Sequence, residues 1–297
     1  MNTSVIGYPF DLVWRNSTLY VTDNSMSRVL ACSLTGECST IMTVSNPRGL
    51  AFNSRGDLFV ASNGQLAIHT LAVNGVQSVY VSNIGAVASI AFDEADNLFI
   101  TQQTLATVIR VPPGGQSKTT FATGLSGARG ICFDAQGTKY IGATDISQIV
   151  AFSAVGTRST YVASAPFVKG MIFHSGLLYW VSSSDPPAIP RVFVMVPSDD
   201  GSTGAPNDGS TGRPNDGSTG APNDGSTGRP NDGSTGQMND GSTGSTSDDS
   251  YSIGARIFAN LSAPAYGLAF DDANNMYVAS ASGIIKVRHT RNSSHVT

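Results

Sequence analysis

The sequence predicts an all-β chain that folds as a six-bladed β-propeller, a ring of four-stranded antiparallel sheets. Three observations lead to this prediction: a unit of about 40 residues recurs six times, each copy carries two aromatic residues at fixed places, and a complete copy divides into four short strand-like runs. The unit is clearest in GLAFNSRGDLFVAS from Gly49 and GLAFDDANNMYVAS from Gly267. The first aromatic positions are Trp14, Phe52, Phe92, Phe133, Phe173 and Phe270, at intervals of 38, 40, 41, 40 and 97 residues.

Each unit is expected to form its strands in a fixed order. The first is a short apolar run such as Gly49–Phe52, and a turn rich in Asp, Asn and Gly follows, because those side chains bond nearby backbone N–H groups. The second strand carries the second aromatic residue, the third alternates as in Ile149–Phe152, and the fourth is rich in β-branched and aromatic residues, as in Lys118–Ala122. The second aromatic residues are Tyr20, Phe59, Phe99, Tyr140, Tyr179 and Tyr277. A lone four-stranded sheet would leave its faces exposed, so the units are expected to stack around a ring.

The predicted ring must also close. The sixth copy ends after its third strand, near Ile284–Arg288, so the last blade lacks a fourth strand. We expect residues 2–6 to supply it, because Val5–Asp11 resembles the end of the other fourth strands and the loop that follows them. On this interpretation residues 1–290 form one propeller domain and residues 291–297 form a tail.

One segment interrupts the repeat. From Gly201 the sequence repeats GSTGAPND and GSTGRPND with a period of eight and few apolar side chains, so it has little to bury on folding. We predict that residues 199–250 are disordered and lie between the third and fourth strands of the fifth blade, at Arg191–Val196 and Ala255–Ala259. The tract is a spacer, an O-glycosylated segment, which its Ser, Thr and Pro content suits, or a neutral expansion of a short DNA repeat.

Composition excludes several classes of partner. Charged residues make up 13% of the chain, about half of the roughly 25% usual in soluble domains, and the formal net charge is −4. We therefore expect neither nucleic acid nor an anionic membrane surface as a partner. No segment is apolar enough for a membrane span, and residues 1–10 show no signal peptide.

The three cysteines are too few for a disulfide scaffold. Cys32 and Cys38 flank the turn Ser33–Glu37, and their spacing allows a disulfide if they close the hairpin between the third and fourth strands of the first blade. Such a bond would indicate an oxidising, extracellular compartment. Cys132 lies on an inner strand next to Phe133 and is expected to be a buried structural thiol.

The first copy of the unit resembles an NHL repeat. Pro9–Leu12 is followed by Leu19–Asp23, an aromatic strand ending in Asp, and then by Ser27–Val29 with its Arg-hydrophobic pair; Pro47–Gly49 matches the opening again. The resemblance covers residues 9–290 apart from the insertion. It implies a six-bladed propeller of the NHL and gluconolactonase/regucalcin-like superfamily. The relatives that this resemblance implies fall into three functional classes: binding or sensor domains, metal-dependent lactonases and esterases, and lyase-type enzymes.

The catalytic groups of these relatives have no clear counterpart in the sequence. Lactonases of this shape resemble one another in a channel site of Glu, Asn and Asp, whereas this chain has Asp11 on its first inner strand and no acidic residue before the apolar run of the others. The lyase kind uses clustered histidines around zinc. No two histidines here have metal-ligand spacing on one strand; they are His69, His174, His289 and His295. A Gly-x-Ser-x-Gly nucleophile motif is also absent. We predict no catalytic and no metal-binding residue.

A ligand site is predicted at one mouth of the channel. The residue before the inner-strand glycine is a cation in three blades, and three such groups could hold a carboxylate or phosphate. These cations are Arg48, Arg129 and Lys169, and the equivalent positions elsewhere hold Phe10, Ala88 and Tyr266. Polar residues that end the second strands at the same face either join this site or pair with the cations as solvated rim residues. They are Asp23, Asn63, Gln102, Asp145 and Asp185.

We therefore predict a non-enzymatic NHL-type propeller that acts as a binding or scaffold module through this channel mouth. Its partner would be a protein or a small anionic ligand, it would need no cofactor, and we expect a monomer. The alternative is a divergent metal-dependent lactonase or esterase of the gluconolactonase-like kind, which would need a divalent cation such as calcium. A third interpretation is an inert surface protein whose functional part is the disordered tract.

Overall fold

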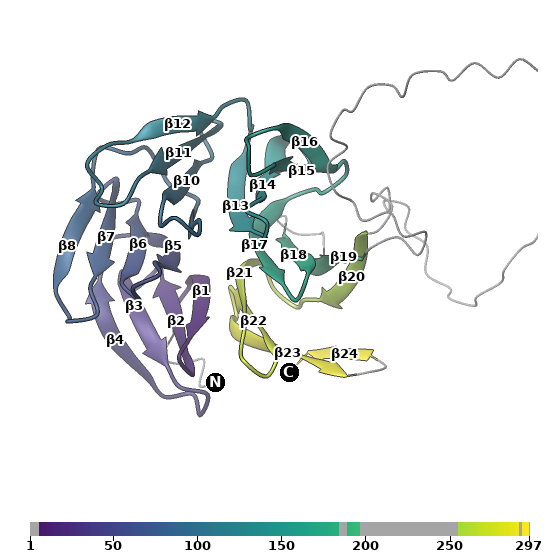
Figure 1. Ribbon diagram of the computed structural model, residues 1–297. Coiled ribbons are helices and arrows are strands. Elements are labelled where there is room, and N and C mark those ends of the chain that lie inside the picture. The colour runs from purple at the N-terminus through teal and green to yellow at the C-terminus, as the bar shows by residue number, and fades with distance from the viewer. Residues whose placement is uncertain (1–5, 184–188, 197–254, 291–292, 297) are drawn as a thin grey trace, which may run out of the picture. The chain divides into compact units, whose positions relative to one another are not determined.

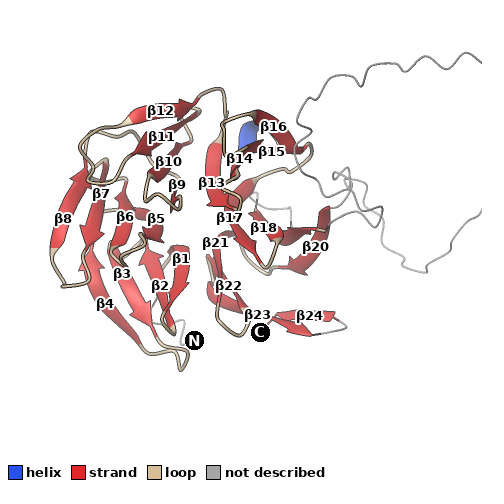
Figure 2. Cartoon of the chain, viewed as in Figure 1, coloured by secondary structure: helices blue, strands red, loops and turns tan. Residues whose placement is uncertain are grey.

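The computed structural model describes residues 6–183, 189–196, 255–290 and 293–296. Within them the chain forms six antiparallel sheets of four strands each, arranged as blades around a common axis (Figure 1). This confirms the predicted six-bladed propeller. Strands make up nearly all of its regular structure (Figure 2), and none of the helical segments in these residues is long and apolar enough to cross a membrane.

Each sheet is built from four strands that are consecutive in the sequence, with the first strand innermost. The first three blades are β1 (Pro9–Arg15), β2 (Thr18–Asp23), β3 (Arg28–Cys32) and β4 (Cys38–Thr43); β5 (Pro47–Phe52), β6 (Leu58–Ser62), β7 (Ala67–Leu71) and β8 (Gln77–Val81); and β9 (Ser89–Phe92), β10 (Leu98–Gln102), β11 (Thr107–Val111) and β12 (Thr119–Ala122).

The last three blades follow the same plan, with one 3₁₀ turn, η2 (Thr144–Ile146), inserted after the second strand of the fourth blade. They are β13 (Ala128–Phe133), β14 (Lys139–Ala143), β15 (Gln148–Phe152) and β16 (Arg158–Val162); β17 (Val168–His174), β18 (Leu177–Ser182), β19 (Arg191–Met195) and β20 (Ala255–Asn260); and β21 (Ala265–Phe270), β22 (Met276–Ser280), β23 (Gly283–Thr290) and β24 (Ser293–Val296).

The two periodic aromatic sets hold neighbouring blades together. At every junction, the second aromatic residue of one blade contacts the first aromatic residue of the next blade. The pairs are Tyr20–Phe52, Phe59–Phe92, Phe99–Phe133, Tyr140–Phe173, Tyr179–Phe270 and Tyr277–Trp14, with ring centroids 4.9, 4.7, 5.3, 5.7, 5.0 and 6.2 Å apart. Four of these pairs meet at steep angles and two are stacked, the arrangements that the quadrupole of the rings favours. The repeat in the sequence is therefore a repeat of interblade contacts.

The buried apolar residues divide in the same way, into six clusters that each combine two adjacent blades. The cluster that closes the ring joins Leu19 and Val21 of the first blade to Tyr277 and Ala279 of the sixth. Because no sheet crosses a junction, the ring is held by side-chain packing between sheets rather than by shared hydrogen-bonded strands.

The last blade corrects one expectation. Its fourth strand is β24, which pairs with β23 from Thr290↔Ser293 to Val287↔Val296, so residues that the sequence assigned to a tail complete the sheet. A hairpin between neighbouring segments requires less loss of chain entropy than bringing the two ends of the chain together. Residues 2–5 of the proposed closing strand lie outside the described residues. Ile6 is buried in the cluster between the sixth and first blades.

Two further expectations concern hairpins between third and fourth strands. The octapeptide tract at 199–250 lies outside the described residues, and the strands that flank it, β19 and β20, pair with each other as antiparallel neighbours. In the first blade Cys32 and Cys38 are opposite each other on β3 and β4 and form a disulfide. Cys132 is buried and carries a free thiol.

The innermost strands approach one another most closely at the positions that we call the inner ring. These positions are Asp11, Gly49, Ser89, Gly130, Gly170 and Gly267. A Cβ atom on Gly170 would meet the carbonyl oxygen of Tyr266 and would lie 2.8 Å from the Cα atom of Gly267, both in the next blade. Glycine is therefore required there by the close approach of two backbones.

Replacing Gly170 with alanine is expected to destabilise the protein by about 1–3 kcal/mol, because the new Cβ meets backbone atoms that cannot rotate away. Urea unfolding measures the change. Ser89→Ala is the matched control, since the third blade already accommodates a side chain at this position and loses only a hydroxyl. Equal stability of the two variants would contradict the close-approach argument.

Candidate functional site

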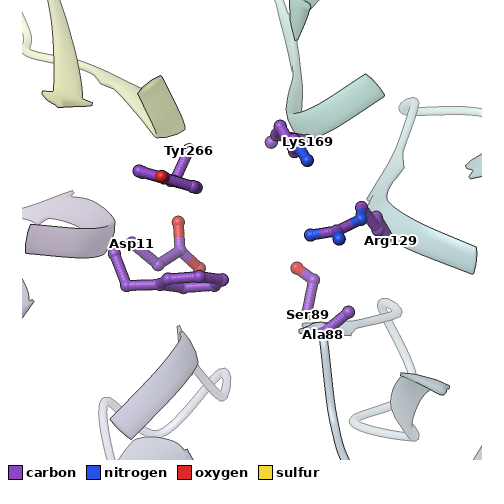
Figure 3. A pocket seen from close by; sticks show the side chains of 8 residues that line it. Asp11, Ala88, Ser89, Arg129, Lys169 and Tyr266 are labelled. Atoms are coloured by element: carbon purple, nitrogen blue, oxygen red, sulfur yellow. The ribbon is translucent and has the colours of Figure 1, made fainter. Parts of the chain in front are cut away.

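The predicted channel mouth is a pocket in the structure. The residue before the inner-ring position is the second residue of the inner strand in five blades and immediately precedes that strand in the third blade, so the ring brings six such side chains to one end of the axis. The pocket is lined by Phe10, Asp11, Ala88, Ser89, Arg129, Lys169, Gly170 and Tyr266 (Figure 3). Its enclosed part is about 20 Å³, little more than the space one water needs. A charged group of a few atoms would fit there, with the rest of a ligand in the open mouth.

Arg129 is the cation that points most directly into this pocket (Figure 3). Its backbone is fixed by the neighbouring blade, since the Thr101 hydroxyl donates a hydrogen bond to the Arg129 carbonyl. The buried Nε atom of Arg129 has no hydrogen-bond partner in the described part of the chain. Burial lowers the pKa of Arg129, and the nearby positive charge of Arg48 lowers it further.

Arg48 lies beside the pocket rather than in its lining. Its guanidinium carbon is 4.3 Å from the centre of the Phe10 ring, a cation–π contact. Its Nε atom is also buried without a partner among the described residues, and burial lowers the pKa of Arg48. Two partly desolvated guanidinium groups that repel each other therefore lie at one channel mouth, and Lys169 adds a third cation to the lining.

An aromatic wall from the first and sixth blades lies opposite Arg129 and Lys169 (Figure 3), and Arg48 packs against its Phe10 ring. Tyr266 stacks on Phe10 with ring centroids 5.3 Å apart, and the hydroxyl of Tyr8 donates a hydrogen bond to the hydroxyl of Tyr266. The site therefore has a cationic side, formed by blades four and five, and an aromatic side against which Arg48 of blade two packs.

Asp11 is a site residue that the sequence analysis noted without assigning it to the mouth. It occupies the inner ring, lines the mouth pocket and also lines a cavity of about 330 Å³ on the other side of the ring. Its carboxylate accepts hydrogen bonds from the backbone N–H groups of Leu12, at 2.9 Å, and Leu50, at 3.2 Å. Burial raises the pKa of Asp11 to about 7 in spite of these two bonds. The signal in the sequence was an acidic residue at a position where four other copies have glycine.

The polar residues predicted at the rim have structural partners. Asp23 accepts hydrogen bonds from the backbone N–H groups of Gly7 and Tyr8, and its carboxylate is 3.2 Å from the Nε atom of Arg28. Burial raises the pKa of Asp23, but these hydrogen bonds, including the one from Arg28, hold it below its usual value. Asp23 and Arg28, the two ends of the stretch that resembles an NHL repeat, thus form an ion pair, and Asp23 also holds the loop before β1.

Asn63 belongs to a set of hydrogen bonds between blades. Its Oδ1 atom accepts a hydrogen bond from the backbone N–H of Val87, 2.7 Å away, two residues before the inner ring of the next blade. The equivalent contacts at three other junctions are Asn24 to the Pro47 carbonyl, Thr144 to the Val168 carbonyl, and the Ala265 N–H to Ser183. A polar residue is therefore needed after the second strand to hold the next blade in place.

Gln102 and Asp145 make local contacts. The Thr107 hydroxyl donates to Oε1 of Gln102 at 2.9 Å, and the Ser126 hydroxyl donates to Asp145 at 3.0 Å. Asp145 is also close enough to Arg129 for its charge to raise the pKa of that residue, against the effect of burial. Asp185 lies outside the described residues.

The structure thus brings Arg129 and Lys169 together in the pocket and places Arg48 beside it. The described rim residues form hydrogen bonds within loops or to the next blade.

The donors for a metal site are sparse at this channel. No group of three His, Cys, Asp or Glu side chains that could hold a metal ion occurs among the residues that the structure describes. Asp11 is the one carboxylate on the inner ring, and the cations at the mouth repel a divalent ion. His69 is partly buried on β7, where burial lowers its pKa, and His174 stacks on Phe270 with centroids 4.0 Å apart. The side chains of His289 and His295 lie outside the described part.

No family model matches the sequence, and no curated protein matches it either. Solved structures with a similar fold include virginiamycin B lyase from Staphylococcus aureus, with 9% identity over 98% of this chain and 84% of that chain, at a TM-score of 0.62. A gluconolactonase from Xanthomonas campestris has 17% identity over 94% and 85%, at 0.62. A chain in a nidogen/laminin complex has 17% identity over 64% and 76%, at 0.56. The resemblance to gluconolactonase-like six-bladed propellers therefore holds for the fold, which also occurs in a complex between two proteins.

Proposed function

We propose that this propeller is a non-enzymatic binding module that holds a small anionic group at the channel mouth. The observation that carries the proposal is the pair of guanidinium groups of Arg48 and Arg129, close enough to repel each other, each with a buried Nε atom that has no partner among the described residues. A carboxylate or phosphate between them would supply the missing acceptors and offset the repulsion. The anion would be a free ligand or an acidic group carried by a partner protein.

The lactonase alternative has less support from the same site. A metal ion that activates a lactone is usually held by several oxygen ligands. The inner ring offers one carboxylate, Asp11, among four glycines and a serine, which is too few oxygen ligands for such an ion. The donor set therefore does not fit a divalent cation, and the positive charge of the mouth suits an anion.

Inorganic phosphate and acetate are expected to raise the melting temperature of the full chain, because a ligand at 100 times its Kd adds about 2.7 kcal/mol of stability. In Arg129→Gln this stabilisation should be lost, since the guanidinium that points into the pocket is removed. Arg256→Gln, at an exposed position on β20, is the matched control and should respond like the wild type.

The same titration includes Ca²⁺ with and without EDTA. Stabilisation by Ca²⁺ that EDTA reverses, without any response to anions, would contradict the proposal and favour the lactonase. An anion response that is unchanged in Arg129→Gln would contradict the assignment of the site.

A further inference from the structure

The mouth pocket contains charges of both signs that do not pair. Asp11 lies on the first blade, and Arg129 lies on the fourth. Figure 3 shows the Asp11 carboxylate and the Arg129 guanidinium facing each other across the pocket, with the Ser89 side chain at its edge. Asp11 is the one acidic residue in the lining.

The separation of these charges is visible in their contacts. Within the described residues, Asp11 forms no ion pair, and its oxygens accept hydrogen bonds from the backbone of Leu12 and Leu50. The Nε atom of Arg129 is buried without a partner in the same residues. An unpaired charge in a partly desolvated site is unfavourable, so each of the two groups would be stabilised by a counter-charge placed in the gap.

We infer that the ligand of this pocket is a zwitterion, an α-amino acid or a compound with the same ammonium and carboxylate groups. Its carboxylate contacts Arg129, and its ammonium group contacts Asp11 across the pocket. This inference rests on the anion site proposed above and makes Asp11 the residue that determines its specificity. The hydroxyl of Ser89 is a further hydrogen-bonding group, and the rings of Phe10 and Tyr266 lie beside the part of the ligand that remains in the mouth.

A simple anion satisfies only half of this site. Bound at Arg129, it would leave Asp11 without a counter-charge, so the buried acid would stay protonated. The other titratable and charged groups near the site are Arg48, Lys169, Tyr8, Tyr266 and Asp145, whose charge acts on Arg129. Among the described residues, Asp11 itself forms no ion pair. An ammonium group beside Asp11 favours the ionised carboxylate, against the effect of burial, while the ligand carboxylate binds Arg129.

The test compares three small probes on the full chain at one pH and ionic strength: acetate, methylammonium and glycine. Acetate carries only the carboxylate, methylammonium carries only the ammonium group, and glycine carries both. Glycine is expected to bind about tenfold more tightly than acetate in calorimetry, the effect of one added charge-assisted hydrogen bond, and methylammonium should not bind.

The matched variant is Asp11→Ser, which gives the first blade the residue that Ser89 provides at the same inner-ring position. It should bind glycine and acetate equally, because the group that recognises the ammonium is gone. Asp272→Ser, at an exposed carboxylate, should keep the preference for glycine. Circular dichroism and the melting temperature verify that both variants fold.

The outcomes separate the two proposals. Equal binding of acetate and glycine by the wild type would overturn the zwitterion inference and leave the anion site intact. A preference for glycine that persists in Asp11→Ser would also overturn it. If neither phosphate, acetate nor glycine binds, the proposed function fails, and the inference fails with it.

Discussion

Replacing Phe99 with alanine is expected to destabilise the propeller by about 3–5 kcal/mol, the range usual for removing a buried aromatic ring. Phe99 is 1% exposed and contacts two other rings, Phe121 of its own blade at 5.1 Å and Phe133 of the next blade at 5.3 Å. The Lys139 ammonium lies 5.8 Å from the centre of the same ring. Truncation would leave a cavity at the junction of the third and fourth blades and remove a cation–π contact from a lysine that is itself buried.

Equilibrium unfolding in urea measures this change, with the slope of the transition confirming that the same surface is exposed in both proteins. Phe167→Ala is the control, because Phe167 is 47% exposed and its loss should change stability by less than about 0.5 kcal/mol. A loss below about 1 kcal/mol for Phe99→Ala would mean that the aromatic contacts do not hold the blades together.

The second large effect concerns pH. Burial raises the pKa of Asp11 to about 7, whereas in the unfolded chain it has its ordinary value of 3.8. Between these two values the folded protein keeps a proton that the unfolded chain has released, so the wild type loses stability as the pH rises from about 4 to about 7. The loss attributable to Asp11 is on the order of 4 kcal/mol, from about three pKa units at 1.36 kcal/mol each.

Asp11→Ser removes this titration. Unfolding free energies of the two proteins, measured from pH 4 to pH 8, should therefore diverge in favour of the variant as the pH rises, even though the variant also loses the hydrogen bonds to Leu12 and Leu50. A constant difference between the two proteins across this range would show that Asp11 titrates normally in the folded state.

The aromatic repeat made most of the fold predictable. Trp14 and Tyr277 are far apart in the chain, but their places in the repeat identify them as the contact that closes the ring. The closing strand could not be predicted in the same way. Residues 293–296 read SSHV and carry almost no strand signal of their own, and their pairing with β23 comes from a short hairpin rather than from a pattern of apolar residues.

The candidate site was partly predictable for a related reason. A repeat locates equivalent positions, so it placed Arg129 and Lys169 at one mouth, where the structure has both. It could not distinguish a ligand contact from a structural contact at the rim, so both interpretations stayed open for Asn63 and Asp23: in the structure Asn63 bonds the next blade and Asp23 bonds the loop before β1. The role of Asp11 depends on its burial and on its position across the pocket from Arg129, and neither can be read from a single residue that departs from the repeat.

Each sheet of the described structure consists of strands that follow one another directly in the chain, and no strand is lent to a neighbouring blade. Any interblade loop is therefore equivalent to any other as a place to cut and rejoin the chain. Circular permutation would preserve all six sheets and all six aromatic contacts, and gain or loss of one whole blade during evolution would disturb only the curvature of the ring. The mouth residues come from five different blades, so such a change would rearrange the site long before it damaged the fold.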